Sequence, residues 1–567
     1  MTFELIDYII SYGTIIVSLC IGLYFGIFKK SQTTDEYLLG NRQMKIVPVA
    51  ISIIASLISG VTVLGNSADV YVFGANFVWA CLAGVVANFI GGFVYVPVLI
   101  KLNTPNVFEY FELRFDRKIK IMASCIYTLQ VLISSSVVAY IPAIAFSQAT
   151  GVNPHTVSFI VCSLCVFYTT IGGFKAVVWT DVFQFLGIIS SVVAVSVIGI
   201  IKAGGIDVVL KEASSGHRLD FNFDIDPTKR DGFWQMMIGS TITCLYYTSL
   251  QPGTVQKYVS VSQFKNVMRV MVVQCCGSII ITFLSAFIGL VVYARYSDCD
   301  PISTGKVPRI DQILPYFVMD IGKHVPGLPG IFIAGIFSAA LSTLSSSLNT
   351  LAATIYGDLV SSFISRNISQ HKEGWILKLI VIMSGSLCAG LTLFLDRMGS
   401  LMSFLNAMTG LIIGIFVGLF SLGIIFPVAN SKGAFFGTVS SLFSVGTIAV
   451  LNHWYTMQGG WKKFAKPVSL KACDVAFNIT LPSANLDYEE PFILFRLSFW
   501  YNSVISALMV TFVGLLVSWF TRRNNYEVYP DLMFSIYRKN SNEELLKKYA
   551  AGVQHDENNT YDFQPVV

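Results

Sequence analysis

Charged residues are scarce in this chain. Asp, Glu, Lys and Arg make up 13% of its 567 residues, against about 25% in an ordinary soluble domain. Hydrophobic residues make up 54%, which excludes a water-soluble globular protein and indicates that lipid surrounds most of the surface. The net charge of +5 is spread among loops, with no basic stripe between aromatic residues. We therefore expect no nucleic-acid partner.

The cysteines offer little metal or redox chemistry. Nine of the eleven fall inside apolar stretches, where Cys acts as a small hydrophobic residue. No spacing of Cys and His suits a zinc site. Cys299 and Cys473 lie in long hydrophilic loops and are the one plausible disulfide pair, with two free thiols as the alternative.

Long apolar runs, by contrast, are abundant, and thirteen are long enough to cross a bilayer. They cover residues 6–28, 46–73, 78–100, 121–149, 156–173, 177–201, 233–255, 270–294, 328–363, 375–395, 400–426, 433–451 and 494–520. No basic segment precedes the first run, and Lys29-Lys30 follows it, so we expect a retained helix rather than a cleaved leader. The pattern predicts an all-α polytopic membrane protein.

Lys and Arg in the loops predict the orientation. With the N-terminus outside, the short inward loops hold most of the Lys and Arg of the short loops, and Arg522-Arg523 begins an inner tail. Three long outward loops are basic too, so the raw totals nearly tie and the short-loop bias decides. The sequon at Asn478 then lies outside, as glycosylation requires. Those at Asn367 and Asn558 lie inside and are expected to be silent.

The chain divides into four expected parts. Residues 1–45 hold an extracellular N-terminus, the first helix and a cytoplasmic loop, and residues 46–426 form the transport core. Residues 427–520 add two peripheral helices and a long extracellular loop. The polar residues 521–567 predict a mostly disordered cytoplasmic tail.

Two of the apolar stretches are interrupted at matching positions. The second contains SGVT at 59–62 and GNS at 65–67, and the seventh contains YYTS at 246–249 and QPG at 251–253. Gly and Pro open the backbone ladder, and the freed groups can bind ligands. The five-span distance indicates two inverted five-helix repeats, spans two to six and seven to eleven, with a binding site between them. Close packing around the glycines is the alternative.

The ninth stretch carries a dense run of hydroxyls, SAALSTLSSSLN, at residues 338–349. Small-residue helix packing, with hydroxyls bonded to carbonyls one turn back, is one interpretation. A sodium site is the other, because a hard cation prefers oxygen ligands. No constellation of His, Cys or carboxylates suggests an enzyme. The large number of spans therefore favours a transporter.

Four motifs in these spans resemble the sodium/solute symporter family. They are YTTIGGFKA at 168–176, VWTDVFQ at 178–184, TVQKY at 254–258 and the hydroxyl run ending in 348–349. The likeness covers spans two to eleven. Lys257 departs from the pattern, since relatives usually have Arg there.

The resemblance implies a LeuT-type fold and a co-transported sodium ion. It implies a sodium site made by the carbonyls of Ala55, Ile58 and Ala339 and the hydroxyls of Ser342 and Thr343. Asp181 matches an acidic residue on the family's sodium path toward the cytoplasm, although a helix-end residue at the interface is the alternative. Tyr247 matches the tyrosine that covers the substrate on its inner side, although it could equally be a core aromatic.

The segments 59–65 and 69–74 are more similar to the monocarboxylate, multivitamin and iodide branch than to the sugar branch. Asp69, Asn66-Ser67 and Val72 depart from that branch, the last standing where Arg is common. We find no Lys or Arg deep in spans two, four, seven, nine or eleven. Half-helix N-termini and the sodium would then balance a carboxylate substrate. This fits a small monoanion or a neutral solute and argues against dianions and polyphosphates.

We therefore expect a sodium-coupled symporter of the plasma membrane, not an enzyme, that moves a monocarboxylate or vitamin-like monoanion into the cell by alternating access. The solute pocket is expected near Ser59, Thr62 and Tyr247. A neutral solute such as a sugar, inositol or choline is one alternative. A non-transporting solute sensor on the same scaffold is another. The hydroxyl run argues against a sodium-independent transporter.

Overall fold

The computed structural model describes residues 3–29, 33–261, 263–361, 369–398, 401–458, 460, 462–473, 492–521 and 529–534, and every regular element in them is a helix. The α-helices are α1 (Leu5–Phe28), α2 (Thr34–Leu39), α3 (Ile46–Leu57), α4 (Gly60–Phe73), α5 (Trp79–Ile90), α6 (Val96–Lys101), α7 (Glu109–Arg114), α8 (Arg117–Thr150), α9 (Pro154–Ala203), α10 (Ile206–Ser215), α11 (Phe233–Leu245), α12 (Pro252–Val259), α13 (Phe264–Arg295), α14 (Ile313–Ile321), α15 (Leu328–Thr354), α16 (Gln370–Leu391), α17 (Leu401–Ile425), α18 (Ser431–Met457) and α19 (Tyr501–Phe520). The π-helices are η3 (Gly91–Tyr95), η4 (Tyr246–Leu250) and η7 (Ile355–Val360). The 3-10 turns are η1 (Gly40–Arg42), η2 (Ala75–Val78), η5 (Ile310–Gln312), η6 (Gly322–His324), η8 (Thr392–Met398), η9 (Lys462–Phe464), η10 (Ile493–Phe495) and η11 (Pro530–Leu532). The sequons at Asn478, Asn367 and Asn558 lie outside the described residues.

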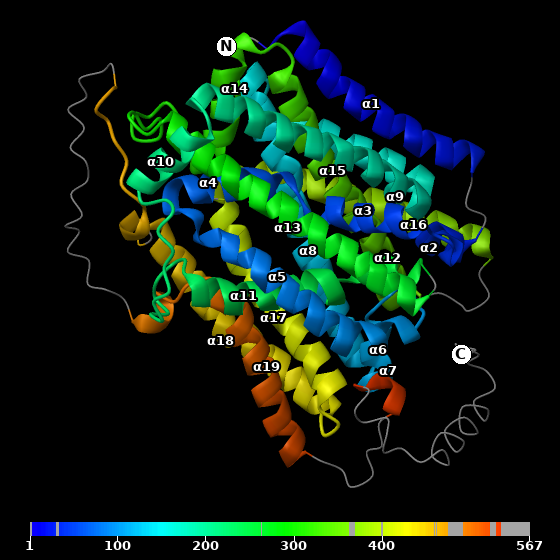
Figure 1. Ribbon diagram of the computed structural model, residues 1–567. Coiled ribbons are helices and arrows are strands. Elements are labelled where there is room, and N and C mark those ends of the chain that lie inside the picture. The colour runs from blue at the N-terminus through cyan, green and yellow to red at the C-terminus, as the bar shows by residue number, and fades with distance from the viewer. Residues whose placement is uncertain are drawn as a thin grey trace, which may run out of the picture.

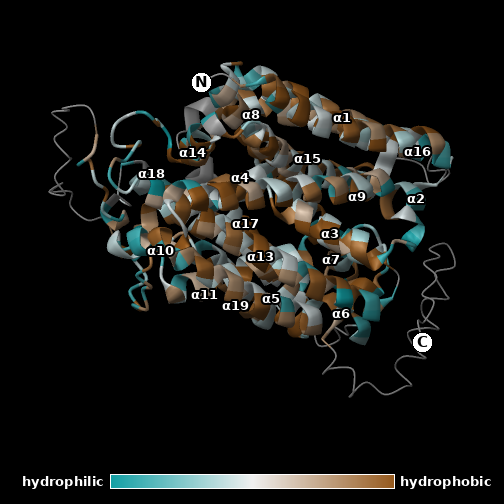
Figure 2. Ribbon diagram, turned by 45° about the horizontal axis from the view of Figure 1, so that its top comes forward, coloured by the Kyte–Doolittle hydropathy of each residue, from teal (hydrophilic) through white to brown (hydrophobic). Residues whose placement is uncertain are grey.

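The long helices form one bundle whose sides suit lipid. Ten described helices are long and apolar enough to cross a membrane, and the bent pair α3–α4 makes an eleventh. The thirteen stretches of the sequence exceed that count because α9 contains two of them, and because η4 and the break after it divide α11–α12 into short pieces. Figure 2 shows hydrophobic residues along the long helices and hydrophilic residues gathered near α10 and near α2 and α6. The expected all-helical polytopic membrane fold is confirmed.

The long helix α9 reverses its direction at Gly173. As one straight helix its 50 residues would rise about 75 Å, more than twice the hydrocarbon thickness of about 30 Å. Gly173 has φ 60° and ψ −161°, a combination that is essentially restricted to glycine. Gly173 lies against Tyr37 of α2, whereas Gly199 lies against Phe317 of α14, at the other end of the bundle in Figure 1. The two halves therefore run in opposite directions, as the sequence predicts for residues 156–173 and 177–201.

Two helices are broken near their middles, at the positions that the sequence indicates. α3 ends at Leu57 and α4 begins at Gly60, with a bend of 55° between them. α11 passes into η4, Gln251 is extended (φ −60°, ψ 129°), and Pro252 starts α12. Proline suits the first helical turn, because its missing N–H would have no partner there. Both breaks leave backbone groups free inside the bundle.

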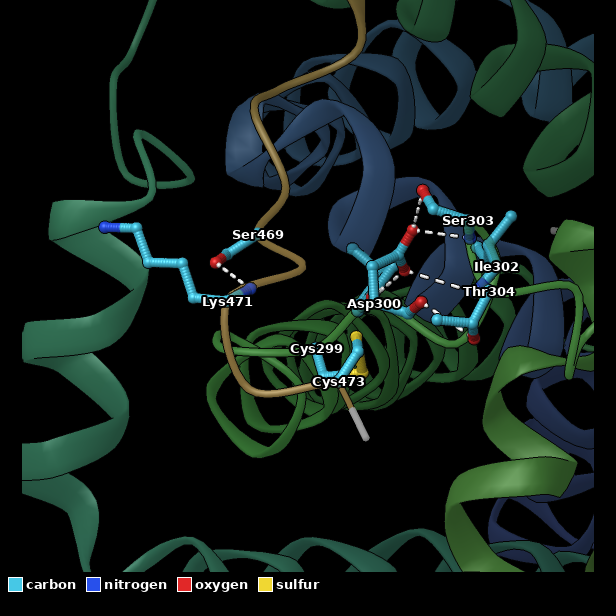
Figure 3. Close-up of a disulfide and its surroundings, with 9 residues drawn as sticks. Cys299, Asp300, Ile302, Ser303, Thr304, Ser469, Lys471 and Cys473 are labelled. Carbon is cyan, nitrogen blue, oxygen red and sulfur yellow. Dashed lines mark hydrogen bonds between the residues drawn. A yellow bond between two sulfur atoms is a disulfide. The ribbon is translucent and has the colours of Figure 1, made fainter. Parts of the chain in front are cut away.

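The two ends of the bundle differ in how they are closed. One end, here named the disulfide face, carries α10, α14 and residues 462–473, and the opposite face carries α2, α6 and α7 (Figure 1). A disulfide joins Cys299 to Cys473, the pair that the sequence singles out (Figure 3). Beside it Asp300 N donates to Ser469 O at 3.0 Å. The long loops of the disulfide face are therefore fastened to each other.

One short segment of the polar C-terminal tail, residues 529–534, is described by the structure. Residues 529–534 pack on the bundle at the opposite face. Tyr110 OH donates to Leu532 O at 3.1 Å, and Phe534 N donates to Ile424 O at 3.0 Å. Leu532 is buried there, and even a short apolar patch in a polar tail gains free energy from burial.

Candidate functional site

The break between α3 and α4 frees carbonyl oxygens in the middle of the bundle. Ile58 (φ −96°, ψ 99°) and Ser59 (φ −92°, ψ 167°) leave the helical conformation. Ser59 Oγ starts α4 by accepting a hydrogen bond from Thr62 N at 3.3 Å. The carbonyls of Ala55 and Ile58 lie at the end of α3, where a continuing helix would have supplied their donors. The structure thus places both predicted carbonyl ligands at the break.

Helix α15 brings the other three predicted ligands to the same break. Ala339 and Ser342 are fully buried. Thr343 Oγ1 lies 3.1 Å from Ser56 O and 3.0 Å from Ala339 O, so its hydroxyl joins α15 to the end of α3. Neutral carbonyl and hydroxyl oxygens are the ligands that a hard cation accepts. Helices α3 and α15 together supply neutral carbonyl and hydroxyl oxygens, and neither helix contributes a carboxylate to this group.

Asp181 lies one hydrogen bond from this group of oxygens. Its side chain is fully buried inside the bundle. Its Oδ1 accepts from Ser342 Oγ at 2.7 Å, and its Oδ2 accepts from Ser52 Oγ at 2.6 Å. A carboxylate with such short hydrogen bonds holds both hydroxyls in fixed orientations. Ser342, a predicted sodium ligand, is therefore oriented by Asp181.

A lysine that the sequence analysis did not place in the site pairs with this carboxylate. Lys257 Nζ lies 3.2 Å from Asp181 Oδ2 and donates to Ser56 Oγ at 2.6 Å and to Ser346 Oγ at 3.0 Å. Its fourth oxygen neighbour is Ser52 O, at 3.1 Å. Lys257 lies just beyond the expected end of the seventh span at residue 255, but its four-carbon stem reaches inward from α12. Asp181 balances the added charge, so the pair is neutral as a whole.

The serines around the ion pair could have been found by their spacing. Ser52 and Ser56 are four residues apart on α3, and Ser342 and Ser346 are four apart on α15. Residues four apart lie on one face of a helix, so each pair points the same way. No such signal exists for Lys257, because its direction depends on how α12 restarts after the break.

A small polar cavity lies beside the ion pair. Its volume is about 40 Å³, and its wall includes Lys257, Thr343, Ser346, Gln251 and Thr254. A cavity needs about 10–15 Å³ to hold one water molecule, whereas pockets for organic ligands measure roughly 300–1,000 Å³. This space therefore suits water or an ion, and it connects a predicted sodium ligand with the Lys257 ammonium.

The predicted solute residues come from the two broken helices. Ser59 Oγ and Thr62 Oγ1 lie 3.3 Å apart at the start of α4. Tyr247 is half-buried on η4, and its ring meets that of Tyr246 edge-on at 5.5 Å. Thr254 Oγ1 donates to Tyr247 O at 2.8 Å, which closes the break between η4 and α12. Two hydroxyls thus face the interior from one break, and an aromatic ring comes from the other.

A second charged cluster lies where α4 meets the disulfide face. Arg230, from the loop before α11, binds Asp69 of α4 through both terminal nitrogens, one at 3.1 Å. It also pairs with Asp231, and its guanidinium lies 3.6 Å from the centre of the Phe73 ring. Trp500 Nε1 donates to Asp231 at 3.0 Å. Burial raises the pKa of Asp231, although the Arg230 charge opposes the shift.

A third cluster ties helices together at the opposite face. Asp358 of η7 lies 3.2 Å from Lys120 Nζ and accepts hydrogen bonds from Asn106 and Ser124. Lys120 also binds a carboxylate of α7. Burial raises the pKa of Glu109, the first residue of α7, to about 7, with the Lys120 charge acting against the shift. This face therefore contains a carboxyl group that titrates near neutral pH.

The sequence and the fold together identify the family. The family described as "Sodium:solute symporter family" matches residues 37–440, well over half of the chain. The chain belongs to this family. As a sodium:solute symporter it is a multi-pass membrane protein that couples sodium to a solute, and it is not an enzyme.

Individual relatives extend over nearly the whole symporter. "Sodium-coupled monocarboxylate transporter 2" of Mus musculus is 34% identical over 99% of this chain and 91% of its own length. The "Putative sodium-dependent multivitamin transporter" of Drosophila melanogaster is 34% identical over 93% and 89%. A Na+-coupled sialic acid symporter, solved in a substrate-bound outward-open state, matches with a TM-score of 0.72 at 22% identity over 91% of this chain and 98% of that chain. This likeness confirms the expected LeuT-type fold.

Proposed function

We propose that this symporter carries a small monocarboxylate, or a vitamin-like monoanion, into the cell together with sodium. The observation that carries the proposal is the contact of Thr343 with Ser56, which joins the α15 hydroxyls to the released carbonyls of α3. The similarity to relatives named as monocarboxylate and multivitamin transporters supports the class of solute. The sodium ligands in this proposal are Ala55, Ile58, Ala339, Ser342 and Thr343.

The charges of the site favour a solute with at most one negative charge. The buried Lys257 and Asp181 cancel each other, so they leave no net positive charge for the solute. A carboxylate near Ser59 and Thr62 would be balanced by the sodium ion and by the N-terminus of α4. A second negative charge would remain unbalanced in a medium of low dielectric constant. Tyr247 would cover the bound solute from the other broken helix.

Transport follows from sodium binding at the break. Sodium entering from outside links α3 to α15 and completes the solute pocket. The two repeats then change their tilt, and sodium leaves past Asp181 and the small polar cavity. Each sodium ion that moves inward gains about 2.3 kcal/mol per 100 mV of membrane potential. By linkage, a solute that binds better in the presence of sodium also tightens the binding of sodium.

The disulfide face is the extracellular face in this proposal. Disulfides persist in oxidising surroundings, such as the outside of the cell, and Cys299–Cys473 belongs to this face. The N-terminus then lies outside, the C-terminus lies in the cytoplasm, and the protein acts in the plasma membrane. Asn478, whose sequon follows Cys473 in the chain, would be glycosylated on the same side.

Uptake measurements test the class of solute. Cells that express the chain are given labelled pyruvate, lactate, pantothenate, biotin, choline, inositol and glucose, with sodium or a replacement cation outside. We expect sodium-dependent uptake of a monocarboxylate or a vitamin. Uptake of choline, inositol or glucose would instead assign a neutral or cationic solute. No uptake by protein at the cell surface would favour a solute sensor.

A double substitution tests the sodium ligands. Ser342→Ala with Thr343→Ala should raise the sodium concentration for half-maximal uptake at least tenfold, with surface expression retained. Ser190→Ala is the matched control, because its exposed hydroxyl bonds only within α9, to Gly187 O. Unchanged sodium activation in the double variant would remove the assignment.

A further inference from the structure

One face of α4 carries a stripe of polar side chains. Ser59, Thr62, Asn66 and Asp69 follow one another at intervals of three, four and three residues, a spacing that places them on the same side of a helix. The stripe begins at the break, where the hydroxyls of Ser59 and Thr62 lie 3.3 Å apart. It ends near the disulfide face, where Asp69 binds Arg230. Asn66 lies between these two groups.

The side-chain amide of Asn66 is an unused hydrogen-bond donor inside the bundle. Asn66 is 3% exposed, and its Nδ2 has no acceptor among the residues that the structure describes. An amide nitrogen carries two N–H donors, and a buried donor without a partner costs free energy. Ser67, the next residue, differs, because its hydroxyl lies 2.8 Å from Ser285 O and holds α4 to α13. The unpaired amide of Asn66 therefore indicates a partner that the described chain does not supply.

The stripe faces the start of the second broken helix. Asp69 binds Arg230 of the loop before α11, whereas Ser67 lies on the side of α4 that meets α13. Residues four apart on a helix are neighbours, so Asn66 is one turn from Thr62 in the direction of the disulfide face. In the proposed transport, the solute enters from that face and passes Asn66 on its way to the pocket.

A free amide donor selects for acceptor oxygens in the solute. An ionised carboxylate offers only acceptors, with about four lone-pair sites, and hydrogen bonds to an ionised oxygen are roughly twice as strong as neutral ones. One carboxylate can therefore accept from the Asn66 amide and from the Thr62 hydroxyl together. The amide is neutral, so it adds no charge to a site where Lys257 and Asp181 cancel each other. A sugar or inositol also presents O–H donors, which an N–H donor cannot pair.

We propose that Asn66 is a specificity-determining residue whose amide donates a hydrogen bond to a carboxylate oxygen of the solute. The inference rests on the proposed function, because it adds a contact to the solute pocket at Ser59 and Thr62. Its consequence is a preference for carboxylates over uncharged solutes of the same size. Asn66 acts on the solute and not on the sodium ion, since the predicted sodium ligands belong to the end of α3 and to α15.

The test is uptake of the labelled carboxylate that the wild type carries best among pyruvate, lactate, pantothenate and biotin. Cells express the full chain, and both solute and sodium are varied. Asn66→Ala should raise the KM for this carboxylate about tenfold, the effect of losing one hydrogen bond to a charged group. The maximal rate per surface molecule should stay within about twofold, because the lost contact holds the bound solute throughout the cycle. Half-maximal sodium at saturating solute should also stay unchanged.

Asn88→Ala is the matched control, because the Asn88 amide bonds within its own helix α5, to Gly84 O at 3.0 Å. It should leave the KM unchanged. An unchanged KM in Asn66→Ala would overturn the inference. Asn66→Leu fills the space of the amide with apolar atoms, and it replaces Asn66→Ala, with the same expected results, if the smaller side chain keeps the protein from the cell surface.

A competition measurement separates contact with a carboxylate from a structural role. The unlabelled carboxylate and its uncharged primary amide each compete with the labelled solute. In Asn66→Ala the preference for the carboxylate should fall about fivefold, because losing a donor weakens an ionised acceptor more than a neutral one. A structural role would weaken both competitors equally, and that result would overturn the inference.

Failure of the proposed function looks different. A wild type that takes up no carboxylate removes the proposed class of solute and the role of Asn66 with it. A wild type with sodium-dependent uptake of a carboxylate, at a KM that Asn66→Ala leaves unchanged, keeps the proposed function and overturns the role of Asn66 alone.

Discussion

The two halves of the broken helix each meet a buried or half-buried ion pair, and the pairs are built differently. At α3 the ammonium of Lys257 meets Asp181 among serine hydroxyls. At α4 the guanidinium of Arg230 donates two hydrogen bonds to the carboxylate of Asp69 and lies over the ring of Phe73. The first pair is surrounded by hydroxyl groups, which can accept hydrogen bonds in several orientations. The second depends on a planar fork that only arginine provides.

The difference between the two ion pairs indicates which end of the broken helix can rearrange more easily. Hydroxyl oxygens can turn from an ammonium to a sodium ion without moving the backbone. A bidentate guanidinium stacked on an aromatic ring loses several contacts at once when it shifts. Under the proposed function, the Asp181 cluster would be the part that responds to sodium, whereas the Arg230 cluster closes the disulfide face.

The largest expected effect follows from Asp181→Asn. The substitution leaves the Lys257 ammonium buried without its carboxylate, and breaking a buried pair in this way costs about 3–5 kcal/mol. We expect the melting temperature to fall by several degrees, and sodium-driven uptake per surface molecule to fall as well, because Ser342 loses the carboxylate that orients its hydroxyl. Adding Lys257→Met should restore much of the melting temperature. Equal destabilisation in single and double variants would show that the two charges are not coupled.

The next effect is expected from Arg230→Met. It leaves the carboxylates of Asp69 and Asp231 without their guanidinium, at a cost of about 2 kcal/mol for lost charged hydrogen bonds. The melting temperature should fall, but sodium should still raise it by as much as in the wild type. Lys229→Met is the matched control, because Lys229 pairs only at the exposed surface with Asp224, where such pairs contribute little. Loss of the sodium response in Arg230→Met would erase the contrast between the two clusters.

The smallest effect concerns Glu109, in the third cluster. Its pKa is raised to about 7 by burial, above the value near 4.3 of an unfolded chain. A raised pKa means that the folded state holds the proton more tightly, so stability is present at low pH and is lost as pH rises through 7. Between pH 6 and pH 8 the loss should be about 1 kcal/mol. Melting temperatures at the two pH values should differ less in Glu109→Gln, and an unchanged difference would contradict the assignment.

The breaks in the helices were predictable because their causes are local. Gly60 and Pro252 each start a new helix after an extended residue, Ser59 or Gln251, and both breaks appear where the sequence indicates. Gly173 likewise separates two apolar stretches through its own backbone conformation. The disulfide between Cys299 and Cys473 was predictable as the one plausible pair, since the other cysteines lie in apolar stretches.

The ion pair was not predictable because its causes are tertiary. The inward direction of Lys257 depends on where α12 lies relative to α3, and sequence distance says nothing about that. The spacing of Ser52 and Ser56 places both on one face of α3, but it does not indicate the lysine that they bind. The packing of residues 529–534 on the bundle was not predicted for a similar reason. The polar composition of the tail does not indicate that one short segment forms hydrogen bonds with Tyr110 and Ile424.

The disulfide also has a consequence for the time course of biosynthesis. Its two cysteines are separated by 174 residues, and the helices α14 to α18 lie between them in the chain. At a synthesis rate of about 5–20 residues per second, Cys299 waits roughly 10–35 s for its partner. During that interval its thiol stays open to other thiols and to the folding machinery. Closure of the bond therefore marks the moment when the later helices have been made and have delivered Cys473 to the correct side.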